Sequence, residues 1–251
     1  MRITMRPLIA GNWKMHGVGS RLNQIEDIAA SVGASRPEAD VLLCVPATLI
    51  FRAARAAAGQ IAIGGEDCAM EAEGAFTGDV SADMLKDAGA SAVIVGHSER
   101  REHHGETDAV VAAKARSALR SGLLAIVCIG ESEAQRRDGK TMVVCGEQLA
   151  GSLPEIPDGG ELAVAYEPLW AIGSGHIPTA ADVIAVHAHA RSCLVLRFGD
   201  EGRAMRILYG GSVKAENAQS ILDLADVGGV LIGGASLSAA DFDAVLRAVP
   251  R

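Results

Sequence analysis

The strongest constraint on the fold is a regular alternation of short apolar runs with longer stretches of helical period. Several of the runs are continuous, as in Val93-Ile94-Val95, which is typical of parallel strands covered on both faces. We predict eight strands, at Leu8–Trp13, Val41–Val45, Ile61–Gly65, Ala92–Gly96, Ala125–Ile129, Leu162–Tyr166, Arg206–Tyr209 and Gly229–Ile232.

Helix candidates lie between these runs, and two of them carry start signals. Thr179 and Ser238 are each followed three residues later by Asp, a near-capping box. The candidates include Gln24–Val32, Leu49–Ala58, Ala109–Arg120, Ala180–Leu196 and Ala239–Val249. Alternation of this kind predicts parallel βαβ units. An open doubly wound sheet would alternate similarly, but eight units in 251 residues favour one closed (β/α)₈ barrel spanning residues 1–251.

Charge and cysteine content narrow the function classes. The net charge of −8, from 31 acidic and 23 basic residues, argues against a nucleic-acid or membrane-surface partner. The five cysteines form no CxxC pair and no metal-ligand cluster, which indicates reduced thiols and predicts no metal. No apolar run reaches the length of a membrane span and the first residues do not resemble a signal peptide, so we expect a cytoplasmic protein.

Unusual polar residues follow the predicted strands, where a barrel of this class carries its chemistry. Asn12 and Lys14 end the first strand, and alternation along the strand would place both on one side. They would bring an amide and an ammonium group to one site. The alternative is a strand end with a solvated lysine.

His97 directly follows the fourth strand and precedes a helical stretch that starts at Ser98. The dipole of such a helix would lower the pKa of the imidazole. A neutral ring could then donate a hydrogen bond to a substrate oxygen. The alternative is a surface histidine beside a charge cluster.

Glu167 follows the sixth strand, which Pro168 must end. This leaves a carboxylate at the barrel mouth. Leu169, Trp170 and Ile172 with Gly173 and Gly175 suit a loop that opens and closes over a ligand. An ordinary βα loop with a capping Glu is the alternative.

Paired glycines follow the seventh and eighth strands, at Gly210-Gly211 and Gly233-Gly234. Glycine lets backbone N–H groups approach a phosphate closely, and these two loops are the usual phosphate site of such barrels. No nucleotide-binding fingerprint is present. The combination predicts proton transfer beside a carbonyl on a small phosphorylated molecule, without a cofactor.

At this point the sequence resembles the triosephosphate isomerase family, whose fold is the TIM barrel. The similar segments keep the family's order and spacing over nearly the whole chain: Gly11–Met15, Gly96–Arg101, Cys128–Glu131, Tyr166–Gly173, Tyr209–Ser212 and Gly233–Leu237. The resemblance implies isomerisation of dihydroxyacetone phosphate to glyceraldehyde 3-phosphate, in glycolysis and gluconeogenesis.

Site roles follow from the same resemblance. It implies that Glu167 is the base and His97 the neutral electrophile. It implies that Lys14 and Asn12 hold the substrate, that Glu99 lies close to Lys14 and that Cys128 is a buried support. The implied phosphate donors are the backbone N–H groups of Gly173, Ser212, Gly233 and Gly234.

The resemblance also implies a homodimer, or in some members a tetramer, through the loop Glu66–Asp79. Thr77 would reach toward the partner's Lys14 and Glu99. Two departures stand out. Glu66-Asp67 replace a pair that is often Gln-Asn, which bears on the pH dependence and tightness of the interface. His176-Ile177-Pro178 close the lid where small residues are common, which bears on its mobility.

Two other functions stay open at this stage. The same chemistry could act on a four-carbon ketose phosphate, because pocket length cannot be read from a sequence. A catalytically dead barrel serving as a binding protein is the other, but such a protein would need none of Lys14, His97 and Glu167. Rates, regulation and the choice between dimer and tetramer are beyond the sequence.

Overall fold

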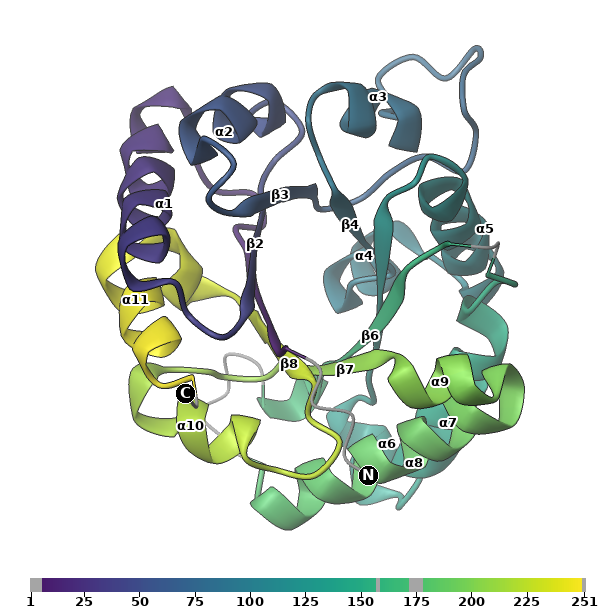
Figure 1. Ribbon diagram of the computed structural model, residues 1–251. Helices are drawn as coiled ribbons and strands as arrows, with labels where there is room; N and C mark the ends of the chain where they lie inside the picture. Colours follow the sequence, from purple (N-terminus) through teal and green to yellow (C-terminus); the bar gives the residue numbers. More distant parts are fainter. Residues whose placement is uncertain (1–5, 157–158, 172–177, 250–251) are drawn as a thin grey trace.

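The computed structural model describes residues 6–156, 159–171 and 178–249. Eight parallel strands form a closed barrel in chain order, with β1 paired to both β2 and β8. Figure 1 looks into this barrel, with the strands inside and the helices around them. The predicted (β/α)₈ barrel is therefore confirmed over the open-sheet alternative.

The strands agree closely with the apolar runs of the sequence. Their bounds are β1 Leu8–Asn12, β2 Asp40–Cys44, β3 Ala62–Gly65, β4 Ala92–Val95, β5 Leu124–Ile129, β6 Leu162–Tyr166, β7 Arg206–Tyr209 and β8 Gly229–Ile232. The last three match the prediction, and the others differ by one residue at one end or both. Gly96 lies outside β4 because its φ of 65° turns the backbone into the left-handed region.

The helices surround the barrel. Their bounds are α1 Leu22–Ser35, α2 Ile50–Ala57, α3 Ala82–Asp87, α4 Ser98–His104, α5 Asp108–Arg120, α6 Glu133–Arg137, α7 Thr141–Ser152, α8 Ala180–Phe198, α9 Asp200–Ala204, α10 Ala215–Leu222 and α11 Ala239–Arg247. Short 3₁₀ helices are η1 Gly19–Arg21, η2 Leu169–Ala171 and η3 Gly234–Leu237. The predicted capping box at Thr179 is present: the Thr179 side chain accepts the Asp182 N–H, and the Asp182 side chain accepts the Thr179 N–H.

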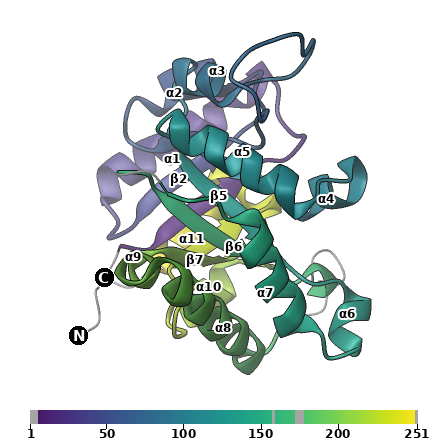
Figure 2. The same cartoon turned by 90° about the vertical axis from the view of Figure 1, so that its right-hand side faces the viewer.

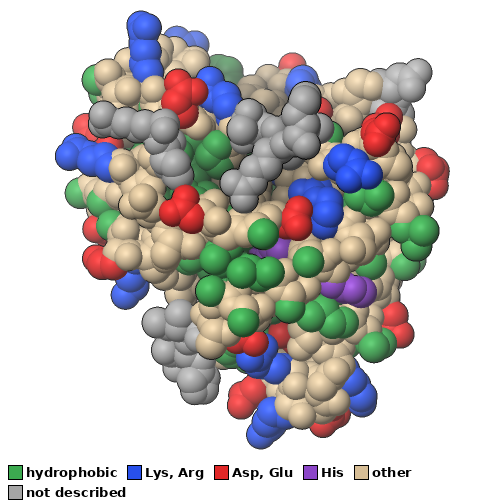
Figure 3. Space-filling view, turned by 60° about the horizontal axis from the view of Figure 1, so that its bottom comes forward, with side chains coloured by type: hydrophobic (Ala, Val, Ile, Leu, Met, Phe, Trp, Pro, Cys, Tyr) green, Lys and Arg blue, Asp and Glu red, His purple; other side chains and the backbone are tan. Residues whose placement is uncertain are grey.

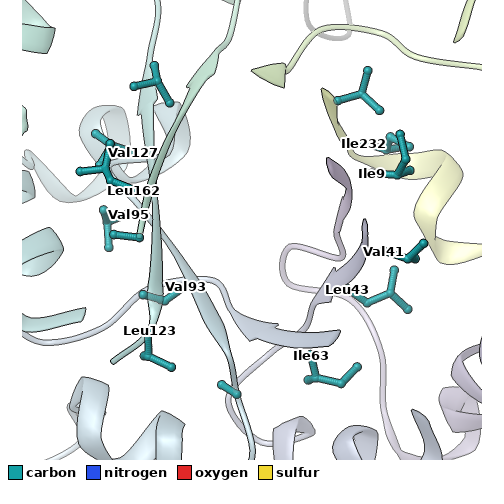
Figure 4. Close-up of a cluster of buried hydrophobic side chains, with 14 of the residues drawn as sticks. Ile9, Val41, Leu43, Ile63, Val93, Val95, Leu123, Val127, Leu162 and Ile232 are labelled. Carbon is teal, nitrogen blue, oxygen red and sulfur yellow. The ribbon is translucent and has the colours of Figure 1, made fainter. Parts of the chain in front are cut away.

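Two buried apolar layers hold the elements together. One lies between the strands and the helices and includes Ile9, Val95 and Ile232 (Figure 4). The other fills the barrel interior and includes Leu42, Ile126 and Leu208. Alternate residues of most strands supply the two layers, so these strands are buried on both faces. The barrel is therefore a packed core that leaves the chemistry to the loops at its end.

The loop between β3 and α3 extends away from the barrel near α3 (Figures 1 and 2). It contains the segment Glu66–Asp79 and exposes Met70 and Phe76. On the face drawn in Figure 3, Lys and Arg side chains are interspersed with Asp and Glu. Among the described residues, no helix is long and apolar enough to cross a membrane.

Candidate active site

A cavity of about 260 Å³ opens at the end of the barrel where the strands terminate. Four polar side chains singled out in the sequence line it: Asn12, Lys14, His97 and Glu167. The loops after β7 and β8 complete the wall. Segments far apart in the chain are thus brought together as predicted.

Asn12 and Lys14 reach the cavity by a different route from the one expected. The strand ends at Asn12, and Lys14 has a φ of 55°. The Lys14 N–H donates to Asn12 Oδ1 at 3.0 Å, which supports this left-handed turn. The intervening Trp13 is buried and donates from Nε1 to the Ser236 carbonyl at 2.9 Å. A backbone turn, and not strand alternation, therefore aims the lysine.

Lys14 is held at its other end by Glu99 in the first turn of α4. The Lys14 Nζ lies 2.6 Å from Glu99 Oε1. Both side chains are partly accessible, so the ammonium group stays hydrated and reachable. The predicted proximity of Glu99 to Lys14 is present in the structure.

His97 immediately precedes α4, and its ring is almost fully buried. Its Nδ1 accepts the Glu99 backbone N–H at 3.2 Å. Its Nε2 lies 2.8 Å from Glu167 Oε1. Because Nδ1 is an acceptor, the ring proton is on Nε2 and the neutral ring donates to Glu167.

Glu167 is buried beyond the end of β6, and both of its oxygens are engaged. Oε1 accepts from His97, and Oε2 accepts the Ser98 backbone N–H at 3.0 Å. The Glu167 N–H continues the ladder by donating to the Ile129 carbonyl at 2.7 Å. The carboxylate therefore rests on the N-terminal turn of α4.

The two groups shift each other's pKa. Burial disfavours the charged carboxylate, but the charge and hydrogen bond of His97 and the Ser98 N–H outweigh it, so the pKa of Glu167 is lowered. Burial also disfavours imidazolium, yet the Glu167 charge and hydrogen bond raise the pKa of His97. The expected lowering of the His97 pKa is thus wrong for this arrangement. Without the Glu167 carboxylate, burial and Lys14 would lower the pKa of His97, and only the Glu99 charge would raise it.

The loops after β7 and β8 present backbone donors to the cavity. The N–H groups of Ser212, Gly233 and Gly234 donate to no acceptor within the described part of the chain. Gly211 must be glycine, because a Cβ there would lie 2.2 Å from the Tyr209 hydroxyl oxygen. Three open donors suit an anion. The fourth predicted donor, Gly173, lies outside the described residues, as does most of the predicted lid.

Glu131, two residues beyond the end of β5, is a buried residue whose importance the sequence did not reveal. Its Oε1 accepts from Tyr166 Oη at 3.2 Å and from Trp170 Nε1 at 2.8 Å. These two donors flank Glu167 in the chain. Arg136 stacks over the Trp170 ring at 3.9 Å. The backbone carrying Glu167 is therefore fixed from α6 and the neighbouring strand.

Arg101 is a second residue that motif reasoning passed over. It donates to the carbonyls of Gly96 and Cys128, at 2.9 and 3.2 Å, and pairs with Asp108 at 2.6 Å. It thus ties the start of α4 to the ends of β4 and β5. Cys128 itself is fully buried, as expected of a support. Nothing in the sequence distinguishes Arg101 from its neighbour Arg100 as the residue that makes these contacts.

The comparisons with known proteins agree with this geometry. A family model described as triosephosphate isomerase matches residues 7–249. The chain belongs to the triosephosphate isomerase family. The triosephosphate isomerase of Afipia carboxidovorans is 56% identical over 247 residues, which cover 98% of each chain. That of Rhodopseudomonas palustris is 53% identical over 253 residues, with both chains fully covered.

A solved structure gives the same result. The crystal structure of triosephosphate isomerase from Bartonella henselae superposes with a TM-score of 0.89 at 47% identity. The match covers 97% of this chain and 99% of the other. The function predicted from the motifs, an aldose–ketose isomerase of the triosephosphate isomerase family, is confirmed.

Proposed function

We propose that Glu167 and His97 carry out the isomerisation of dihydroxyacetone phosphate to glyceraldehyde 3-phosphate as base and hydrogen-bond donor. The 2.8 Å contact between His97 Nε2 and Glu167 Oε1 at the cavity carries this assignment. It joins a carboxylate of lowered pKa to a ring that presents N–H. A base and a donor placed this closely can act on adjacent atoms of one substrate.

The substrate enters by replacing the contact between the two residues. Its carbonyl oxygen accepts the His97 Nε2–H, and Glu167 turns to the neighbouring carbon. Glu167 takes the carbon-bound proton as the C–H electron pair moves into an enediolate. The same carboxyl then returns a proton to the adjacent carbon, and His97 Nε2 passes the hydroxyl proton of the first oxygen to the oxygen that was the carbonyl, so that the carbonyl group changes carbon. No net oxidation occurs, so the scheme needs no redox partner.

Charge on the enediolate and the phosphate is balanced by Lys14 and backbone donors. The Lys14 ammonium, held by Glu99 at 2.6 Å, lies on the cavity wall beside Asn12. The open N–H groups of Ser212, Gly233 and Gly234 suit the phosphate, and Gly173 is proposed to join them. Fixed donors of this kind stabilise developing negative charge without reorganisation.

A deuterium experiment tests the proposed proton transfer. The protein is incubated with dihydroxyacetone phosphate in D₂O without added cofactor, and glyceraldehyde 3-phosphate is followed by NMR. We expect isomerisation with solvent deuterium on carbon, because the proton held by a carboxylate exchanges with water. A product wholly free of deuterium, together with full activity of Glu167→Gln, would indicate direct hydride migration and exclude Glu167 as base.

We also infer that the chain is one barrel domain that works as a homodimer in the cytoplasm. Met15 is 96% exposed in the single chain. Met70 is exposed on the same cavity wall, and Phe76 is exposed on the loop after β3. Exposed apolar groups gathered near one site are typical of subunit contacts. The charge balance and reduced thiols of the sequence support a cytoplasmic location.

A further inference from the structure

Glu66 lies directly after β3, below the turn that aims Lys14. The Lys14 N–H, which donates to Asn12 Oδ1, also faces the Glu66 carboxyl. Glu66 shares the wall of a cavity of about 720 Å³ with Lys14, Glu99 and Met15. This carboxyl therefore contacts the backbone of the residue that supplies the cation of the active site.

Among the described residues of the single chain, the cations around Glu66 are already paired with other carboxylates. Its Oε1 is buried and has no hydrogen-bond partner among the described residues. Lys14 Nζ is already paired with Glu99. Lys114 and Arg100 are paired with the neighbouring carboxylate of Asp67, at 2.7 and 2.9 Å. Glu66 is half-buried, and ionisation would leave charge on a buried oxygen without a partner, so the uncharged acid is the favoured form.

The titratable groups that face Glu66 support the same form. They are Lys14 after β1, Cys44 at the end of β2 and Glu99 in α4. Burial raises the pKa of Glu66 to about 8; the Lys14 N–H acts in the opposite direction, and the Glu99 charge adds to the rise. Burial also raises the pKa of the Cys44 thiol, so that group is uncharged as well.

We propose that Glu66 is a positioning residue for the isomerisation, and that it holds the left-handed Lys14 turn in its protonated, uncharged form. The proposal rests on the role of Lys14 given above. A neutral carboxyl supports the Lys14 N–H and leaves the ammonium to Glu99 and the substrate. An ionised one places a second negative charge beside Glu99, where it competes for the ammonium and opposes an anionic substrate.

The expected signature is an alkaline fall in kcat/KM. As the pH rises through about 8, the acid ionises, and kcat/KM of the wild type should drop on the order of tenfold by pH 9.5. Glu66→Gln keeps an uncharged acceptor for the Lys14 N–H, so it should retain the activity near pH 7. Its alkaline fall should move to a higher pH than that of the wild type, because the ionisation at Glu66 is gone.

Two further variants separate positioning from simple loss of charge. Glu66→Met removes both the charge and the acceptor, so kcat/KM should be low at every pH. Asp67→Asn changes the neighbouring, ion-paired carboxyl and should keep the wild-type pH profile. Circular dichroism and light scattering at pH 7 and pH 9.5 accompany each profile.

The outcomes distinguish this inference from the proposed function. An alkaline fall that Glu66→Gln leaves at the same midpoint overturns the role of Glu66, as does a Met variant as active as the Gln variant. A wild type that dissociates as its activity falls also overturns it, because Glu66 would then act on assembly. Deuterium incorporation at pH 7 would still support Glu167 and His97 in each case.

Discussion

Glu167 and His97 are each other's hydrogen-bond partners at the mouth of the barrel, and that pairing sets their protonation states. The carboxylate keeps a lowered pKa, so it is charged and ready to accept a proton at neutral pH. The ring keeps its proton on Nε2 because Nδ1 accepts a backbone N–H. In the proposed mechanism, the substrate breaks this contact, and the two groups then act on different atoms of the substrate.

Replacing the base tests this arrangement directly. Glu167→Gln keeps the shape of the side chain, and its amide oxygen can still accept from either His97 or Ser98, so we expect normal folding. It cannot take a proton, so kcat should fall roughly 10²–10⁴-fold. KM should change much less because the phosphate donors are unaltered. Steady-state kinetics and thermal melting check both statements, and near-wild-type turnover would remove Glu167 from the mechanism.

At the scale of elements, the apolar runs were enough to predict the strands and their order. A buried parallel strand leaves a continuous signal, and the capping residue Thr179 marks a helix start. The turn at Lys14 left none, because a positive φ at a non-glycine residue depends on partners elsewhere in the chain. The contacts of Glu131 with Tyr166 and Trp170 join residues that lie 35 and 39 positions apart, so only the fold reveals them.

Helix α8 carries a buried histidine that should make the protein sensitive to acid. His187 packs edge-on against Tyr166, and its Nε2 has no partner among the described residues. Burial lowers its pKa from 6.5 to about 4. The unfolded chain therefore binds a proton that the folded chain refuses, and stability is lost as the pH falls from 6.5 toward 4.

The size of this loss can be measured by substitution. A shift from 6.5 to about 4 corresponds to about 3 kcal/mol of unfolding free energy. In His187→Gln, the drop in urea-unfolding free energy between pH 7 and pH 4 should shrink by about that amount at fixed protein concentration. His103→Gln, at an exposed site on α4, should leave the drop unchanged. Equal drops in all three proteins would contradict the role of His187.

At the scale of the whole molecule, the exposed loop after β3 and the active site share a wall. Met15, Met70 and Lys14 all line the same cavity, which is open in the single chain. A second copy that covers these apolar groups would also exclude water from the Lys14–Glu99 pair. Assembly and catalysis are therefore expected to depend on each other.

A charge at the tip of the loop after β3 should disrupt both assembly and catalysis. Thr77 is exposed in the single chain, and Thr77→Arg would bury an unpaired cation in the proposed interface. We expect monomers with little activity. Leu196→Arg, at a side chain 90% exposed on α8, should stay dimeric and active. Light scattering with kinetics decides the matter, and a fully active wild-type monomer at micromolar concentration would refute the proposal.

The pairing of β8 with β1 also has a consequence during synthesis on the ribosome. Every other strand can pair with a neighbour already made, but β1 waits for the last strand to complete its second edge. A nascent chain that stalls before Gly229 exposes open edges on both β1 and β7. Such edges recruit strands from other chains. Prematurely terminated products should therefore aggregate or be degraded by proteases. They should not accumulate as partly active fragments.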